Sequence, residues 1–157
     1  MDIIRENDNS PVYTIGIAAN LTNTSVHALR TYEKKGIIIP HVTDSNRRLF
    51  SKSDIERIKC IRKHLDNDGL NIAGIKALLA TIPCWLIKPC SKASQQSCDA
   101  FTNTTIPCWE AEHKAPECQD ADCHKCPVYR MGDSCGDVKS LNKQVYMQNN
   151  NYGKITK

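Results

Sequence analysis

The feature that most constrains this chain is the distribution of its cysteines, eight of nine of which lie after residue 83. They surround a pentapeptide, Thr-Ile-Pro-Cys-Trp, that occurs at residues 81–85 and again at residues 105–109. These two copies contain both tryptophans of the protein. A short segment so rich in cysteine is held together by disulfides or bound ligands more than by a large apolar core. The sequence therefore predicts an ordinary globular module followed by a cysteine-rich one.

The start of the chain bears on whether those cysteines are ligands. Residues 1–8 have no basic run, apolar core or cleavage site of a secretory signal, and no apolar stretch approaches membrane-spanning length. We therefore expect a cytoplasmic protein that avoids the membrane and uses its thiols for metal or redox chemistry. The sequence contains no phosphate loop, nucleophile–base pair or paired carboxylates, so we do not expect an enzyme. The net charge of +4 permits nucleic-acid binding without arguing for it.

The first half of the chain begins with two predicted short helices. Thr14 is suited to cap the first, and Ser25 to cap the second, which is predicted to run through Lys35. Asn23 suits the left-handed backbone of the tight turn between them, and Gly36 is placed to end the second helix. Two short helices joined in this way predict a helix-turn-helix.

A hairpin and two more helices follow. Residues 37–40 and 47–50 are predicted strands that flank a polar turn, with Arg47 and Arg48 near its tip. Arginines on such a hairpin are typical of a wing that contacts the phosphate backbone. Ser53 and Glu56 are predicted to form the capping box of the third helix, in which Cys60 is expected to be a free, buried thiol.

The fourth predicted helix begins after Asn71, which is expected to cap it, and ends before Pro83. Most of its apolar residues fall on one side at helical spacing. The first half therefore reads as four helices and a small hairpin.

Three segments carry a resemblance to a known family: residues 13–16, residues 29–40 with their Leu-Arg-Thr-Tyr-Glu run, glycine and closing proline, and residues 46–51. Together they resemble the DNA-binding domain of MerR-type regulators, with Phe50 where tyrosine is usual. Residues 69–75 are most similar to the branch that contains the heat-shock repressors of the HspR type. The resemblance covers about residues 12–82 and implies a winged helix-turn-helix.

The resemblance also implies a DNA-binding surface. Residues 25–32 would enter the major groove, Arg47 and Arg48 would hold the wing to the backbone or minor groove, and the Tyr32 hydroxyl would meet a phosphate. The expected DNA-binding residues are Thr14, Ser25, His27, Arg30, Tyr32, Arg47 and Arg48. In the alternative interpretation, Arg30 pairs with Glu33 and the wing arginines are only solvated. The implied partners are double-stranded promoter DNA and, indirectly, RNA polymerase.

The cysteine-rich segment reads as a duplicated unit. Each copy opens with Pro-Cys-Trp and closes with a cysteine three residues before an aromatic ring, Phe101 in the first copy and Tyr129 in the second. The pattern is similar to small "CW…CP(A/V)Y" motifs appended to bacterial regulatory proteins. The candidate metal ligands are Cys84, Cys90, Cys98, Cys108, Cys118, Cys123, Cys126 and Cys135. Eight thiolates suffice for up to two four-cysteine sites, and the sequence does not say which belong together.

Two centres fit these spacings. The two-residue gap between Cys123 and Cys126 is common in zinc sites. With Cys118 separated from Cys123 by four residues, the run also reproduces the start of a plant-type iron–sulfur loop. An iron–sulfur cluster, zinc and a metal-free thiol switch all stay open, whereas His113 and His124 are expected to be neighbours of the site and not ligands.

These observations predict a mainly α fold with a small β wing. Its parts would be a winged helix domain at 12–82, an irregular cysteine-rich module at 83–136, and a polar tail at 137–157 that we expect to be disordered. The long dimer helix usual in MerR-type proteins is not expected, so a homodimer would form through the cysteine module or on DNA, or the protein would act as a monomer. The expected function is a transcription regulator that senses redox state or metal. The alternatives are a repressor with a structural zinc module and an adaptor whose module docks a protein.

Overall fold

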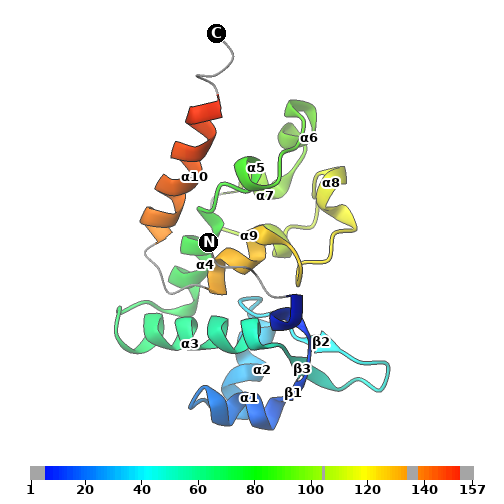
Figure 1. The fold of residues 1–157 in the computed structure, drawn as a ribbon, viewed down its shortest axis with the longest axis vertical. Helices are drawn as coiled ribbons and strands as arrows, with labels where there is room; N and C mark the ends of the chain where they lie inside the picture. The colour runs from blue at the N-terminus through cyan, green and yellow to red at the C-terminus, as the bar shows by residue number, and fades with distance from the viewer. Residues whose placement is uncertain (1–5, 104, 134–137, 153–157) are drawn as a thin grey trace. The chain divides into compact units, whose positions relative to one another are not determined.

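The computed structural model describes residues 6–103, 105–133 and 138–152, and Figure 1 shows its elements. The described residues divide into two compact units. The first contains the chain up to Ile72 together with Gly132 and Asp133, and the second contains residues 73–131 and the C-terminal helix. The expected boundary at residue 82 thus falls about one helix later than the division between the compact units.

The first unit is a helical body with a three-stranded sheet. All pairings in the sheet are antiparallel and its order is β1-β3-β2. In Figure 1 the β2–β3 hairpin extends away from the helices as a wing. The elements are η1 (Glu6–Asn9), β1 (Tyr13–Thr14), α1 (Ile15–Leu21), α2 (Val26–Lys34), β2 (His41–Val42), β3 (Arg48–Phe50) and α3 (Lys52–Asp66).

The local signals of the helix-turn-helix are confirmed. The Thr14 hydroxyl accepts the amide of Ile17 at the start of α1, and the Ser25 hydroxyl accepts the amide of Ala28 at the start of α2. Asn23 has φ 49° in the turn between these helices. Gly36 has φ 76° directly after α2, the left-handed backbone that commonly follows a helix.

The hairpin differs from its prediction. The first strand of the wing is residues 41–42 instead of residues 37–40, because Ile37 and Ile38 are buried in the core and leave the strand to begin beyond Pro40. A third strand, β1, was not predicted. Its Tyr13 pairs with Phe50 of β3, and a two-residue strand has too short an alternation to be recognised in a sequence.

The capping box of α3 lies two residues before its predicted place. The Ser51 hydroxyl accepts the amide of Asp54 at 3.1 Å, and the Asp54 carboxylate accepts the amide of Ser51 at 2.8 Å. The predicted pair of Ser53 and Glu56 was therefore wrong. Both pairs satisfy the sequence pattern, but only Ser51 and Asp54 are both buried at the end of β3, where an unpaired amide would be costly.

The core of the first unit gathers apolar side chains from its helices and from the segment after Gly36. Its buried members include Ala18, Leu29, Tyr32, Ile37, Ile38, Phe50, Ile55, Ile58 and Ile61. Arg57 is only 1% exposed, and its guanidinium donates to the Ile37 carbonyl at 2.9 Å and pairs with Asp133 at 3.5 Å. Cys60 is disulfide-bonded, so the expectation of a free thiol there was wrong.

The second unit consists of short helices between two longer ones. Its longer helices are α4 (Ile72–Ala80), whose first residue belongs to the first unit, and α10 (Val138–Tyr152). The short elements are α5 (Cys84–Ile87), α6 (Lys92–Gln96), α7 (Asp99–Thr102), η2 (Cys108–Glu110), α8 (Pro116–Gln119) and α9 (Pro127–Arg130). The turn η3 (Met131–Asp133) follows, and its last two residues belong to the first unit.

Helix α10 occupies the segment whose polar composition predicted a disordered tail. It packs beside α5, as Figure 1 also shows, and the Asn142 side-chain amide donates to the Thr81 carbonyl at 3.3 Å. Composition alone does not reveal such a docking contact. Among the described residues, no helix combines the length and apolar character needed to cross a bilayer.

Candidate nucleic-acid interface and cysteine cavity

Helix α2 and the wing present separate basic side chains to solvent. Ser25, His27 and Arg30 are exposed on α2, and Arg47 is exposed at the base of the wing tip. The tip is shaped by Thr43, whose hydroxyl accepts the Arg47 amide at 3.1 Å, and by Asn46 with φ 61°. An exposed helix and a basic hairpin on one small body are the features that such domains bring to a DNA groove and its phosphates.

Arg48 has a different environment from Arg47. Its Nε and Nη2 donate to the Glu33 carboxylate of α2 at 3.1–3.3 Å, and its Nη1 donates to the Asn46 side chain at 3.0 Å. The alternative pairing of Arg30 with Glu33 is not what the structure contains, since Glu33 pairs with Arg48. Arg48 therefore holds the wing against α2 through Glu33. The sequence contained no sign of this contact, because Glu33 was paired only with residues of its own helix.

The structure gives two further expected DNA-binding residues internal roles. Tyr32 is only 4% exposed and belongs to the core, so burial accounts for it better than a phosphate contact does. Thr14, like Ser25, uses its hydroxyl as a helix cap. Arg30, Arg47 and His27 are left as the exposed, freely available members of the expected set.

Seven cysteines of the second unit line one cavity of about 40 Å³, enough for a few water molecules. They are Cys84, Cys90, Cys98, Cys108, Cys118, Cys123 and Cys126, and all are free thiols. The eighth expected ligand, Cys135, lies outside the described residues. The rest of the lining is largely apolar and includes Phe101, Trp109 and Val128. Residues from both sequence repeats therefore meet in a single place.

Burial raises the pKa of four of these thiols, most strongly at Cys84 and Cys108. Burial, followed by the nearby thiols of Cys98 and Cys118, raises the pKa of Cys84 to about 11. Burial, followed by the thiols of Cys84 and Cys126, raises the pKa of Cys108 to about 12. Close thiols that cannot all ionise together are the arrangement that a bound metal stabilises, because the metal supplies the compensating charge.

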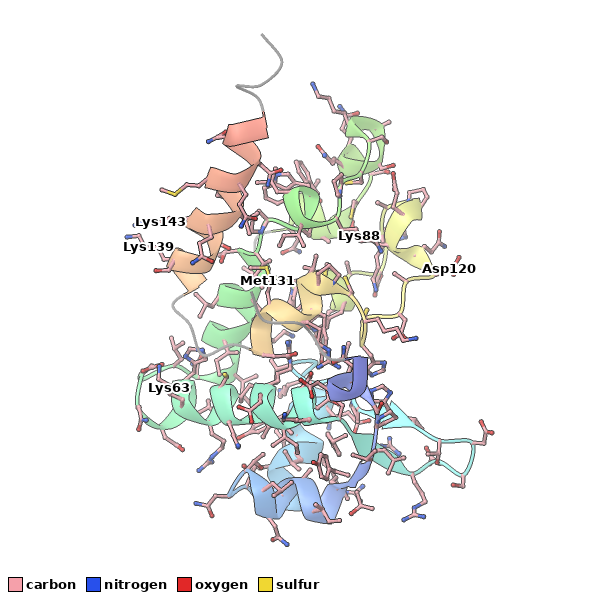
Figure 2. The ribbon with its side chains drawn as sticks, viewed as in Figure 1. Lys63, Lys88, Asp120, Met131, Lys139 and Lys143 are labelled. Atoms are coloured by element: carbon pink, nitrogen blue, oxygen red, sulfur yellow. The ribbon has the colours of Figure 1, made fainter. Side chains whose placement is uncertain are left out.

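Two lysines line the same cavity. Burial raises the pKa of both Cys118 and Cys123, and the charge of Lys88 opposes that rise at each thiol. Lys114 acts in the same way on Cys123, and Figure 2 labels Lys88 in the region of α7 and α8. No sequence signal identified these lysines, because neither stands at a recognisable spacing from its cysteines.

Within the described ranges, no three His, Cys, Asp or Glu side chains form a group that could hold one metal ion. In a tetrahedral zinc site the Zn–S bond of about 2.3 Å brings sulfurs to about 3.8 Å from one another. An iron–sulfur cluster needs wider spacing, because each thiolate binds a different iron. The cavity of about 40 Å³ is lined by thiols of both repeats, and zinc and an iron–sulfur cluster both stay candidates for it.

The two histidines of the module have aspartate partners. The His113 Nδ1 lies 3.1 Å from Asp99, and the His124 Nδ1 lies 3.1 Å from Asp122. Neither histidine is among the residues that line the cysteine cavity.

The first unit therefore has the elements of a winged helix-turn-helix. Residues 13–82 match the family described as "MerR HTH family regulatory protein". The winged region of this chain is thus a MerR-family helix-turn-helix domain, as the resemblance implied.

Individual relatives match the same region. The HTH-type transcriptional regulator GlnR of Bacillus cereus is 42% identical over 71 residues, which are 45% of this chain and 54% of that protein. The putative heat shock protein HspR of Streptomyces coelicolor is 33% identical over 72 residues, 46% of this chain and 48% of that protein. MlrA, an HTH-type transcriptional regulator of Escherichia coli, is 37% identical over 70 residues, 44% of this chain and 28% of its own length. The chain spans about half the length, or less, of these curated relatives.

Proposed function

We propose that this chain is a sequence-specific transcription regulator that binds promoter DNA and acts on RNA polymerase through the promoter. The support comes from the MerR-family domain, its exposed Arg30 and Arg47, and relatives that are named transcriptional regulators. In this proposal α2 enters the major groove, while Arg47 contacts the phosphates beside it. Arg48 sets the position of the wing through Glu33.

We further propose that the cysteine module binds an iron–sulfur cluster and reports redox state or metal supply to the DNA-binding domain. The observation that carries this proposal is the convergence of seven thiols from both repeats on one cavity. When bound, such a cluster would supply a centre whose loss or oxidation reorganises the short helices around it. The reorganised module would change how two winged domains of a homodimer are spaced on an operator. A structural zinc ion is the second candidate, supported by the two-residue spacing of Cys123 and Cys126.

The DNA-binding proposal can be tested by selecting duplexes from a random-sequence library and measuring affinity by fluorescence anisotropy across salt concentrations. Arg30→Ala and Arg47→Ala should each lower affinity about tenfold and reduce the salt slope by about one. Lys59→Ala, which removes an exposed charge from α3, is the matched control and should change neither value. Equal losses in all three variants would indicate only non-specific charge attraction.

The metal proposal can be tested by assaying iron, sulfide and zinc in protein purified without oxygen, and then measuring DNA affinity with and without the centre. Iron with sulfide and a changed affinity on cluster loss support a sensor. Zinc with an unchanged affinity supports a structural module. A regulatory activity in cells that survives Arg30→Ala and Arg47→Ala would instead indicate an adaptor whose cysteine module docks a protein partner.

A further inference from the structure

The duplication seen in the sequence is also a duplication of structure. In the first repeat, the Trp85 ring packs edge-to-face on Phe101 with centroids 5.1 Å apart and planes at 73°. In the second, Trp109 packs on Tyr129 with centroids 5.0 Å apart and planes at 88°. Each repeat therefore joins its Cys-Trp start to its closing Cys-x-x-aromatic turn by the same ring contact.

The two repeats pair crosswise. The opening helix of the first repeat, α5, packs against the closing helix of the second, α9, and α7 of the first packs against η2 of the second. A polar contact adds to this exchange, since the Glu117 carboxylate accepts the Ser91 amide at 3.4 Å and the Ser94 hydroxyl at 3.2 Å. The two halves thus form one body, with their opening and closing turns arranged in two mixed pairs.

One cysteine marks the start of each of these four turns. Cys84 begins α5 and Cys108 begins η2, while Cys98 and Cys126 stand directly before α7 and α9. All four line the shared cavity. The four thiols are therefore structural equivalents in the two repeats that line one cavity.

The other three cysteines lack this equivalence. Cys90 lies six residues after Cys84, Cys118 lies ten residues after Cys108, and Cys123 has no counterpart in the first repeat. Cys118 and Cys123 are also the thiols that feel the charge of Lys88. Cys90, Cys118 and Cys123 line the same cavity, but none of them stands at the start of an opening or closing turn.

We propose that Cys84, Cys98, Cys108 and Cys126 are the ligands of one centre shared by the two repeats, and that this centre is a single iron–sulfur cluster. The proposal rests on the proposed metal binding of the module and adds the ligand set and the number of centres. Four thiolates are the usual ligand number of such a cluster. Cys90, Cys118 and Cys123 lie around it and are not needed to hold it.

The test reconstitutes the full-length chain anaerobically with ferrous iron and sulfide and measures iron, sulfide and visible absorbance per chain. Serine replaces one cysteine at a time, at the four proposed ligands and at the matched controls Cys90, Cys118 and Cys123. We expect iron and sulfide equivalent to one cluster in the wild type, and about a tenfold or greater loss of cluster affinity at each proposed ligand. Each control should stay within about twofold of the wild type, since no cluster bond is lost there.

A second measurement does not depend on how the variants fold. The wild-type chain, with and without its centre, is treated with a thiol-alkylating reagent and the modified cysteines are mapped by mass spectrometry. The four proposed ligands should be protected only when the centre is present, whereas the three controls should react in both states.

The outcomes separate the two proposals. A wild type that binds neither iron with sulfide nor zinc overturns the proposed metal function, and this inference with it. A wild type that binds zinc alone overturns the cluster assignment. Iron and sulfide equivalent to two clusters per chain would overturn the single centre. A cluster that is lost as strongly on replacing a control cysteine as on replacing Cys108 would overturn the ligand set. Both results would leave metal binding itself intact.

Discussion

The first unit surrounds the 15-residue helix α3 with buried apolar side chains, whereas the second has helices of three to five residues from α5 to α9 and thiols at its centre. Helices that short are not stable by themselves. In the first unit, caps and an apolar core stabilise the helices. In the second, the proposed metal centre would share that role with a small set of buried apolar side chains, so the stability of the two units should depend on different variables.

The largest expected effect is removal of the metal centre. A chelator with reductant should abolish the amide protection of residues 84–130, because metal-site formation in such small modules supplies on the order of 10 kcal/mol. The first unit should keep its protection. Hydrogen–deuterium exchange followed by mass spectrometry measures both units in one sample. If both units lost amide protection together, the idea that only the second unit depends on a bound metal would be contradicted.

Metal loading should also be strongly coupled to pH. The pKa values of Cys84 and Cys108 are raised to about 11 and about 12, so both thiols are protonated at neutral pH before metal enters. A metal must displace these protons, and its affinity should therefore rise with pH and fall in acid. We expect release of about four protons per centre, one from each ligand thiol, in a weakly buffered zinc or iron titration. Release of two or fewer would contradict a four-thiol site.

The next largest effect is expected from a substitution that creates a cavity in the core of the first unit. Ile58 is fully buried, and Ile58→Ala should lower the free energy of unfolding by about 2–5 kcal/mol. Denaturant unfolding of the first unit measures the change, while the metal content of the second unit should stay constant. Lys59→Ala, at the neighbouring exposed position, serves as the control. A loss of metal in Ile58→Ala would show that the two units are not independent.

A smaller effect is expected at the contact between the wing and α2. Glu33→Gln weakens the grip on Arg48, and we expect about a fivefold loss of DNA affinity, equivalent to an ion-pair contribution of about 1 kcal/mol. Removing a negative charge near DNA would by itself strengthen binding, so the sign of the change is diagnostic. Glu56→Gln on α3 makes the same charge change outside this contact. Tighter binding by Glu33→Gln would exclude the positioning role.

The smallest expected effect lies in the turn of the helix-turn-helix. Asn23 has φ 49°, and Asn23→Ala should destabilise the first unit by roughly 1–2 kcal/mol because a β-carbon disfavours this backbone. Asn23→Gly should have nearly no effect on stability, since glycine accepts the same φ. Thermal unfolding of the three proteins gives the comparison. Equal midpoints for the alanine and glycine variants would argue against backbone strain as the cause.

Local chemistry explains what the sequence could predict in the first unit. The caps at Thr14 and Ser25, the turn at Asn23 and the helix end at Gly36 depend on neighbouring residues only, and the structure contains all of them. The capping box could not be placed, because two overlapping pairs fit the same pattern and burial decides between them. The pairing of Glu33 with Arg48 joins residues 15 positions apart, which helix-surface reasoning does not consider.

In the second unit the sequence identified the candidate thiols but not their arrangement. Counting eight thiols indicated up to two sites, since spacing along a chain does not say which loops meet. The structure brings the seven described thiols to one cavity because the repeats pair crosswise. Helix α10 was missed for a related reason, as its polar sequence contains no sign of the contact between Asn142 and Thr81.

The crosswise pairing of α5 with α9 and of α7 with η2 has a consequence for assembly. Each repeat keeps its own ring contact, but these turns also pack against turns of the other repeat, so a chain with one repeat would have to find those turns in a second molecule. Two full-length chains that exchange their second repeats would make the same ring contacts and present the same four cysteines at each centre. Such an exchange is domain swapping, a low-cost route to a twofold-symmetric dimer. It would join two winged domains without a long coiled coil.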